Sequence, residues 1–248
     1  MNRRVALAAG VVAVVAVSYG PGFGAANIPA YVAAAVADTH RPAANTGQDA
    51  ARHPAEMMVF AQVKPGDKVV EFWPGAGYAT RLLSKIVGPT GKVYAMNAPT
   101  FPDRLKHAVD SVTGDPEYAN VTVLEQPFDQ IRVPQAVDVV WTSENYHDFQ
   151  NTGPFKADTA AMDKAVFAAL KPGGLFIITD YVAAPGSGKR DTQTLHRIDP
   201  EFIKQEVTAA GFVLDGQSEL LKNASDTHTE RSHQESDQVM LRFRKPRA

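Results

Sequence analysis

Residues 71–80 of the chain read EFWPGAGYAT, and they follow the segment Lys68 to Val70, which is typical of the start of a buried β-strand. Two glycines, Gly75 and Gly77, stand in the loop between this strand and a helix expected over Tyr78 to Val87. A loop in this position lies at the carboxyl edge of a parallel sheet, where ligands usually bind. The stretch therefore predicts a ligand-binding turn after the first strand of an α/β sheet.

The chemistry of this loop favours some ligands over others. The glycines leave the backbone accessible, and the amide groups that open the helix at Tyr78 present partial positive charge to a ligand. A dinucleotide fingerprint needs a further glycine three residues after Gly77, where this chain has Thr80. Thr80 therefore disfavours a nicotinamide dinucleotide, and a loop that serves only as a tight turn stays open as an alternative.

Strand and helix patterns alternate along the chain. Strands are expected at 68–72, 92–96, 121–124, 136–142 and 175–179, and helices at 48–63, 78–87, 102–112, 159–170 and 200–210. The central strands are almost continuously apolar, which is typical of parallel strands covered by helices on both faces. No helix separates the last two strand-like segments, 212–221 and 239–243, so they should pair as an antiparallel hairpin.

Composition narrows the class of protein. A chain of 248 residues with 44% apolar residues is long enough for one large domain. A formal charge of -2 and the lack of a basic tract disfavour a nucleic-acid partner, so a small-molecule substrate is expected. Cysteine is absent, which excludes disulfides, thiolate nucleophiles and cysteine metal sites.

The N-terminus has the order of a secretory signal. Arg3 and Arg4 precede an uncharged run from Val5 to Val17, and small residues follow up to Ala26. We expect a protein that is exported to the periplasm or anchored in the membrane by this segment, with a cytoplasmic position left open. The expected organisation is a signal peptide or anchor at 1–26, a helical lead-in at 27–66 and the main domain at 67–248.

Several features together resemble a known family. Glu71 lies near the end of the first strand, Lys171-Pro172-Gly173-Gly174 precedes a late apolar strand, and a hairpin closes the chain. In these features the chain resembles the class I S-adenosylmethionine-dependent methyltransferases. The resemblance implies an α/β, three-layer Rossmann-like fold with seven strands in the order 3-2-1-4-5-7-6, mostly parallel with an antiparallel last strand.

Three shorter segments resemble a bacterial group of predicted methyltransferases. They are the Trp73-Pro74-Gly75 form of the first loop, Asn145-Tyr146-His147-Asp148 after the fourth strand, and His196-Arg197-Ile198-Asp199 before the last helix. The implied cofactor is S-adenosylmethionine, and the implied reaction is methyl transfer.

The resemblance also implies cofactor-binding residues at the carboxyl ends of the first three strands: Glu71, Gly75, Gly77, Tyr78, Asn97 and Asp129. Glu71 and the glycine backbone would face the methionine part of the cofactor. Asn97 stands where the family usually has an acid for the ribose hydroxyls, and it carries no charge. Asp129 is the candidate for the adenine amine, with a turn-forming aspartate as an equal alternative.

The segment after the fourth strand supplies the candidate catalytic residues Asn145, His147 and Asp148. Positioning can supply most of the catalysis in methyl transfer, so a dedicated base is optional. If the acceptor is a hydroxyl or a protonated amine, His147 is suited to take its proton near neutral pH. Capping of the next segment is an equal alternative for His147 and Asp148.

Two histidines in the polar connection at 222–238 suggest a metal site on composition alone. His228 and His233 stand five residues apart beside Glu230 and Glu235, without a third fixed ligand. A solvated loop explains them better, and we expect no metal there or elsewhere. Separately, we expect Arg197 and Asp199, from the segment before the last helix, to hold a lid formed by residues 183–194.

The sequence thus predicts an enzyme that transfers a methyl group from S-adenosylmethionine to a small molecule. Two alternatives stay open: a noncatalytic, exported small-molecule-binding module on the same fold, and an NAD(P)-dependent oxidoreductase. The signal-like N-terminus motivates the first of these, because S-adenosylmethionine is made in the cytosol.

Overall fold

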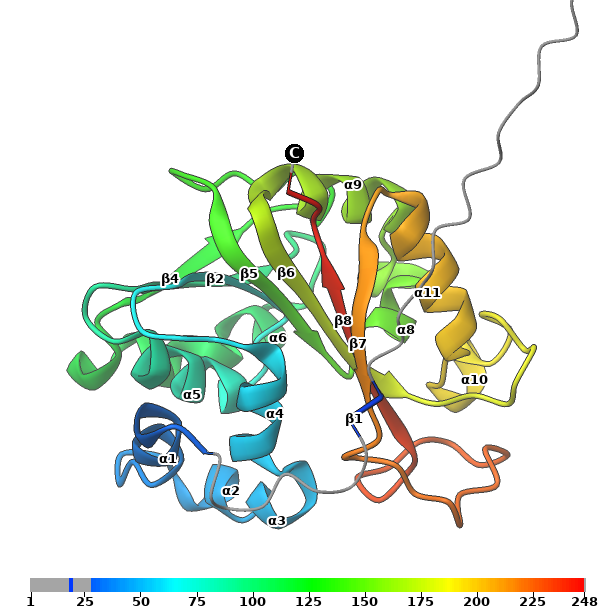
Figure 1. Cartoon of the computed structure of the whole chain (residues 1–248), viewed down its shortest axis with the longest axis horizontal. Helices are drawn as coiled ribbons and strands as arrows, with labels where there is room; N and C mark the ends of the chain where they lie inside the picture. Colours follow the sequence, from blue (N-terminus) through cyan, green and yellow to red (C-terminus); the bar gives the residue numbers. More distant parts are fainter. Residues whose placement is uncertain (1–17, 20–27, 248) are drawn as a thin grey trace, which may run out of the picture.

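The computed structural model describes residues 18–19 and 28–247 (Figure 1). A twisted sheet runs through its centre, with the strands in the order β1-β7-β8-β6-β5-β2-β3-β4. The strands are β1 Ser18–Tyr19, β2 Lys68–Phe72, β3 Lys92–Asn97, β4 Val121–Glu125, β5 Val137–Ser143, β6 Leu170–Tyr181, β7 Val213–Ser218 and β8 Gln238–Arg244. All seven expected strands are present, and the two-residue β1 adds a short parallel partner to β7.

The order of the strands confirms the predicted fold class. Counted from β2 along the chain, they follow one another across the sheet as 3-2-1-4-5-7-6. Strands β2 to β6 pair in parallel, and β8 runs antiparallel to both of its neighbours, β6 and β7. The crossovers change direction between β2 and β5, and ligands bind at the carboxyl side of such a switch point.

Helices cover both faces of the sheet and make three layers. In Figure 1, α1 to α5 lie together on one side, and α8 to α11 lie on the other. The helices are α1 Ala30–Val36, α2 Ala43–Thr46, α3 Asp49–Arg52, α4 Pro54–Ala61, α5 Tyr78–Val87, α6 Asp103–Lys106, α7 Asp110–Thr113, α8 Tyr146–Phe149, α9 Thr159–Ala169, α10 Thr192–Leu195 and α11 Pro200–Ala209, with short 3-10 turns η2 His107–Val109, η3 Pro116–Tyr118 and η4 Gly153–Phe155.

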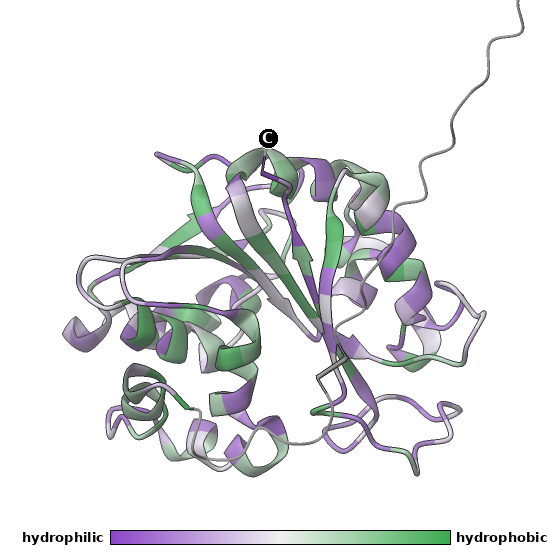
Figure 2. Ribbon diagram, in the orientation of Figure 1, coloured by the Kyte–Doolittle hydropathy of each residue, from purple (hydrophilic) through white to green (hydrophobic). Residues whose placement is uncertain are grey.

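An apolar core lies on each face of the sheet, between the strands and the helices. Each central strand contributes side chains to both cores. Val69 and Ile177 pack in the core beside α1, α4 and α5, whereas their neighbours Val70 and Ile178 pack in the core beside α9 and α11. Successive side chains of a strand point to opposite faces, so a strand buried on both faces must be apolar throughout. Figure 2 shows long green stretches along the central strands, interrupted by a few hydrophilic residues.

The lead-in differs from the single helix expected over residues 48–63. The structure has two helices there, α3 and α4, which meet at His53 and Pro54. Proline disfavours the helical conformation of the residue before it and has no amide to continue the hydrogen-bond ladder. His53 accordingly adopts the left-handed conformation, with φ of 45°. The apolar spacing was right, but Pro54 divides the helix.

The lead-in helices share a core with the sheet. Val32 and Ala35 of α1 are buried in the same apolar cluster as Leu82 of α5. Residues 1–26, where a signal or anchor is predicted, lie outside the described residues apart from Ser18 and Tyr19. Within the described residues, no helix combines the length and apolar character that crossing a membrane requires.

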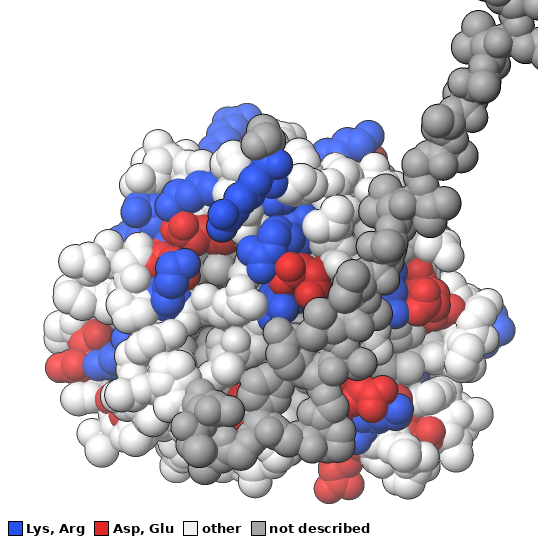
Figure 3. All heavy atoms as spheres, viewed as in Figure 1, with Lys and Arg blue, Asp and Glu red and all other residues white. Residues whose placement is uncertain are grey.

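Charge of both signs is mixed on the surface. On the face that Figure 3 shows, Lys and Arg side chains gather toward the top of the view, with acidic side chains among them. Arg242 and Arg244 both pair with Asp215, at 2.6 and 2.8 Å, and Lys171 pairs with Asp138 at 2.7 Å. Paired charges of this kind give little attraction for a polyanion.

Candidate active site

A cavity of about 330 Å³ opens at the carboxyl edge of the sheet, beside the ends of β2 and β5. Its size is within the range of small-molecule sites. It brings together five of the residues predicted from the sequence: Glu71, Gly75, Tyr78, Asn145 and Asp148. The switch point of the sheet therefore has a cavity of suitable size and chemistry.

Glu71 is the polar group at the floor of this cavity. It is the fourth residue of β2, and its side chain is on the face of the buried Val69. Only 3% of Glu71 is exposed, and its Oε2 has no hydrogen-bond partner. Burial raises the pKa of Glu71 to about 7, and the neighbouring Thr80 hydroxyl lowers it in part. A buried carboxylate without a donor is costly, so a ligand that brings a donor would be stabilised here.

The two glycines of the loop have different roles. Gly75 has φ of 54°, and a β-carbon built on it would meet nothing within 4 Å, so its missing side chain keeps the cavity open. Gly77 has φ of 82° and begins α5, but it does not line the cavity. A β-carbon on Gly77 would collide with Val112. Gly77 therefore permits close helix packing, and its predicted contact with the cofactor stays a prediction.

Trp73 directly follows β2 and precedes the two glycines of the loop. It has φ of 48°, and its amide donates to the Met96 carbonyl at 2.8 Å. The indole ring stacks on Phe155 with centroids 4.8 Å apart, and it contacts Phe101 at 4.6 Å. Trp73 also lines the cavity, so it adds an aromatic wall.

Asn97 and Asp129 do not line the cavity. Asn97 is buried, its Nδ2 donates to the Lys106 carbonyl at 3.1 Å, and its Oδ1 has no partner. Asp129 is exposed and borders a separate, open depression together with Ile131. Their assignments to ribose and adenine remain predictions from the resemblance.

The lead-in forms the roof of the cavity, a role that sequence reasoning missed. The lining residues of the lead-in are Asn45 of α2, Gln48 directly before α3, Arg52 of α3 and Met57 of α4. Arg52 pairs across the opening with Glu144, at 2.9 Å. Apolar spacing in the lead-in indicated a helix but gave no sign of which side chains would face a ligand.

A carboxylate fastens this roof to the loop helix. Asp49 accepts two hydrogen bonds from Arg41, at 2.8 and 2.6 Å, and a third from the Tyr78 hydroxyl at 2.8 Å. These contacts lower the pKa of Asp49, although burial alone would raise it. The Tyr78 ring also lies under the Arg52 guanidinium, 4.8 Å from its centroid. Tyr78 is thus held at the cavity wall by the lead-in.

Asn145 connects the ends of two strands. Its Nδ2 donates to the carbonyls of Phe72 and Trp73, at 3.2 and 3.4 Å. The side chain therefore ties the loop after β5 to the loop after β2 while lining the cavity. Its predicted catalytic role stays a prediction.

His147 is buried next to the cavity in α8, with 2% of its surface exposed. Its backbone amide donates to Asp180 Oδ2, and its Nδ1 lies 2.7 Å from Asp180 Oδ1. Burial lowers the pKa of His147, but the carboxylates of Asp180 and Asp148 raise it more, and the net shift is upward. Asp180, at the carboxyl end of β6, therefore orients the imidazole.

The other ring nitrogen of His147 faces two further polar groups. Its Nε2 lies 3.2 Å from His196 Nδ1 and 3.4 Å from Asp148 Oδ1, and those two atoms are 3.2 Å apart. Among the described residues, this is the group of three histidine or acidic side chains whose donor atoms all lie within 4.8 Å. His196 was quoted in the sequence only as part of a resembling segment, since it is far from His147 along the chain.

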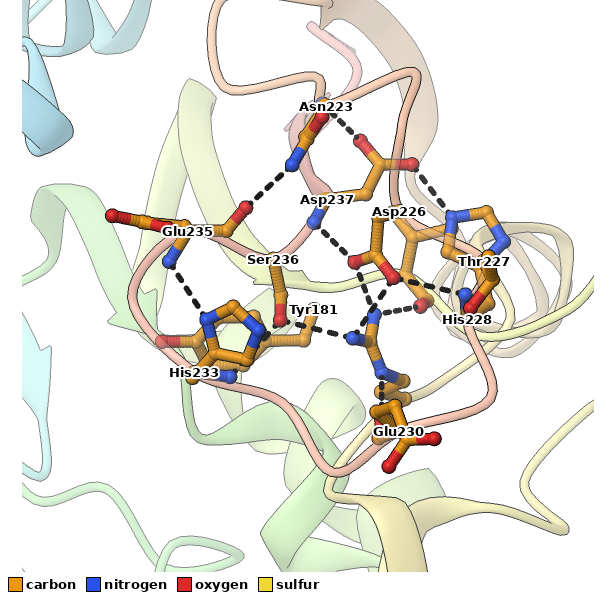
Figure 4. A network of polar contacts seen from close by, with 12 residues as sticks. Tyr181, Asn223, Asp226, Thr227, His228, Glu230, His233, Glu235, Ser236 and Asp237 are labelled. Atoms are coloured by element: carbon orange, nitrogen blue, oxygen red, sulfur yellow. Dashed lines mark hydrogen bonds and ion pairs between the residues drawn. The ribbon is translucent and has the colours of Figure 1, made fainter.

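Arg197 and Asp199 hold different segments. Asp199 Oδ2 accepts from the Gly186 amide at 2.8 Å, so Asp199 does fasten the segment 183–194. Arg197 instead holds the connection between β7 and β8, through Asp226 at 2.8 Å and Ser236 at 2.9 Å. Figure 4 shows Asp226, Ser236 and Asp237 in this network. Arg197 also donates to the Val182 carbonyl at 2.9 Å, directly before the segment 183–194, and its predicted role in holding that segment stays a prediction.

The sequence has a partial match to a curated methyltransferase. No protein-family model matches the chain. The protein-L-isoaspartate O-methyltransferase of Ignicoccus hospitalis is 32% identical over 101 residues, which cover 34% of this chain and 46% of that protein. The chain thus spans less than half the length of this relative.

Solved structures share the fold. A SAM-dependent methyltransferase from Aquifex aeolicus superposes with a TM-score of 0.56 at 17% identity, over 77% of this chain and 88% of its own. The cyclase SpnF superposes with a TM-score of 0.59 at 14% identity, over 85% of each chain. At these identities the similarity establishes the fold, which is that of the class I S-adenosylmethionine-dependent methyltransferases.

Proposed function

We propose that this protein transfers a methyl group from S-adenosylmethionine to a small-molecule acceptor. The observation that carries the proposal is the cavity at the switch point of the sheet, where the unpartnered Oε2 of Glu71 lies beside the open turn at Gly75. The partial match to a methyltransferase sequence supports the same activity.

The residues of the cavity fit the methionine part of the cofactor. When bound, S-adenosylmethionine supplies an electrophilic methyl group on a sulfonium. Glu71 Oε2 would accept a hydrogen bond from the cofactor ammonium, which is the donor that the carboxylate lacks. Gly75 leaves room beside it, and the Trp73 ring offers an apolar wall. Gly77, Tyr78, Asn97 and Asp129 complete the predicted cofactor site.

The acceptor side of the cavity is assigned to the segment after β5. Asn145 and Asp148 line the cavity, and His147 lies directly behind Asp148. These residues would orient the acceptor toward the methyl group, and orientation can account for a large part of the rate. The paired surface charges favour a small molecule over a nucleic acid as the acceptor.

Calorimetric titrations test the ligand class. S-adenosylmethionine and its demethylated product S-adenosylhomocysteine should each bind with one site per chain, and NAD should give no heat. Binding of NAD alone would establish the oxidoreductase alternative. Heat from none of the three would remove the proposal.

A noncatalytic binding module is the second candidate. The signal-like order of the N-terminus favours it, because S-adenosylmethionine is made in the cytosol and an exported enzyme would need a supply. The two candidates differ in turnover. A sample that binds S-adenosylmethionine but forms no S-adenosylhomocysteine with any acceptor of a broad set would favour the module.

We propose in addition that the protein is exported or is anchored by its N-terminus. The support is the sequence order of Arg3 and Arg4, the apolar run from Val5 to Val17 and the small residues up to Ala26. Sequencing the N-terminus of the protein purified from its own cells, and a reporter fused to its C-terminus, would test cleavage and side of the membrane. A full-length chain with a cytoplasmic reporter would contradict export.

A further inference from the structure

Three metal-ligating side chains converge beside the cavity. His147 Nε2, His196 Nδ1 and Asp148 Oδ1 form a triangle with sides of 3.2, 3.2 and 3.4 Å. His147 and Asp148 come from α8, and His196 directly follows α10, which lies beside α8. A methyl transfer that depends only on the positioning of its reactants does not require these three side chains to meet.

We propose that His147, Asp148 and His196 bind one divalent first-row transition-metal ion. An ion about 2.1 Å from each of the three donor atoms would lie about 1 Å outside their plane, which is ordinary geometry for imidazole and carboxylate ligands. Two imidazoles with one carboxylate suit Zn²⁺, Fe²⁺ or Mn²⁺ better than Mg²⁺ or Ca²⁺. Three protein ligands also leave coordination positions open.

The surroundings of His147 suit a metal ligand. Asp180 Oδ1 lies 2.7 Å from His147 Nδ1, so the proton is held on Nδ1 and the lone pair is on Nε2, the corner of the triangle. Ligating histidines commonly donate their second ring nitrogen to a carboxylate in this way. Asp148 is supported similarly, because Asn151 Nδ2 donates to Asp148 Oδ1 at 2.8 Å. His147 and Asp148, the two proposed ligands from α8, therefore each have a hydrogen-bond partner outside the triangle.

The third corner is held in a strained backbone. His196 has φ of 53° in the left-handed region, which is uncommon for residues other than glycine. Its neighbour Arg197 is completely buried and hydrogen-bonded to Asp226 and Ser236, so the chain cannot relax there easily. Strain that the surroundings maintain is typical of functional sites.

The ion would lie where the acceptor is expected. Asp148 is the corner of the triangle that also lines the cavity. If the proposed methyl transfer is correct, an open coordination position would hold an oxygen or nitrogen of the acceptor, and His147 would act as a ligand instead of a base. Metal binding itself does not depend on that activity.

A metal titration tests the site directly. The full chain, freed of metal with a chelator, should bind one Zn²⁺ per chain in calorimetry, and Co²⁺ should give the visible absorption of a bound ion. His196→Asn should weaken Zn²⁺ binding by at least about 100-fold, since loss of an outer partner alone costs about 10- to 100-fold. Asparagine tolerates the left-handed conformation, so the fold should persist, as circular dichroism would verify.

Two further variants complete the experiment. His107→Asn removes an exposed histidine that also pairs with an aspartate, Asp110 at 3.0 Å, and it should leave Zn²⁺ affinity unchanged. Asp180→Asn removes the outer carboxylate of His147 and should weaken binding by about 10- to 100-fold while altering the Co²⁺ spectrum. No Zn²⁺ binding by the wild type, or equal affinity in wild type and His196→Asn, would overturn the proposal.

A titration of the same metal-free sample with S-adenosylmethionine separates the two proposals. Zn²⁺ binding without cofactor binding would leave the metal site standing and remove the methyl-transfer function. Cofactor binding without Zn²⁺ or Co²⁺ binding would do the reverse.

Discussion

Asp138 and Glu71 lie at opposite edges of the same sheet and differ in their hydrogen bonds. At the amino edge, Asp138 accepts from the Lys68 amide at 2.9 Å and from the Lys171 ammonium at 2.7 Å. At the carboxyl edge, Glu71 is almost completely buried and its Oε2 has no partner. Lys68 and Glu71 belong to the same strand. The amino edge is therefore arranged for stability, and the carboxyl edge leaves a group free for a ligand.

Two residues with a strained backbone also lie at the carboxyl edge. Trp73 and Glu144 directly follow β2 and β5, and both have positive φ, 48° and 60°. Each such residue costs on the order of 1–3 kcal/mol. Both line the cavity. Strain and unsatisfied polar groups thus meet at the edge that carries the candidate site, and substitutions at the two edges should have different consequences.

The largest effect is expected from Gly75→Asp at the carboxyl edge. The new side chain would project into open space in the cavity, next to Glu71, and aspartate tolerates positive φ. S-adenosylmethionine affinity should fall by at least about 100-fold, or roughly 3 kcal/mol, in calorimetry. Gly153→Asp is the matched control, because Gly153 also has positive φ and open space but is not part of the cavity lining. Equal loss in both variants would contradict the assignment.

The next effect, on stability, is expected from the charge of Glu71. Its pKa is raised from 4.5 to about 7 by burial. The unfolded chain releases this proton near pH 4.5 and the folded chain near pH 7, so the ligand-free fold should lose stability as pH rises between these values. The loss would reach about 3 kcal/mol above pH 7. Urea unfolding at pH 5 and pH 8 should show this decline in the wild type and not in Glu71→Gln.

The same ionisation should favour the cofactor. A charged Glu71 attracts the cofactor ammonium, so S-adenosylmethionine should bind more tightly as pH rises through 7. Glu71→Gln should bind more weakly and lose that pH dependence. Parallel pH profiles for the two proteins would show that Glu71 does not contact the cofactor.

The smallest effect is expected from Asp138→Ala at the amino edge. The Lys68 amide would lose its acceptor, which should lower the free energy of unfolding by about 1–3 kcal/mol. Lys171→Met, the control, removes only a partly exposed ion pair and should cost less than about 1 kcal/mol. Both variants should keep wild-type S-adenosylmethionine affinity in calorimetry. Weaker binding in Asp138→Ala would show that the edges are not independent.

Much of the fold was predictable because the apolar pattern of each segment agrees with the secondary structure that the segment adopts. Continuous apolar segments such as 137–141 and 175–178 indicated strands buried on both faces, and both are central strands. Asp138 lies inside one of them, and its contacts with Lys68 and Lys171 give it a structural role. The failure at residues 48–63 came from weighing apolar spacing above the proline at position 54.

The candidate site was predictable only where its residues lie next to strand ends. Glu71, Gly75 and Asp148 were found this way, because every parallel strand delivers its following loop to one edge. Arg52 and Gln48 come from the lead-in, where no pattern signals a roof over the cavity. The pairing of His147 with His196 depends on how α8 and α10 pack, and neither sequence segment records that contact.

The position of β8 has a consequence for how the chain folds. Among the described strands β8 is the last along the chain, yet it lies between β6 and β7. Until β8 inserts, β7 has no bridge to the central strands, and Phe176 cannot pair with the distant Phe243. Contacts of such long sequence separation form slowly. We therefore expect β8 to be inserted late in folding. Until then the edge of β6 is unpaired and can form non-native contacts with other strands.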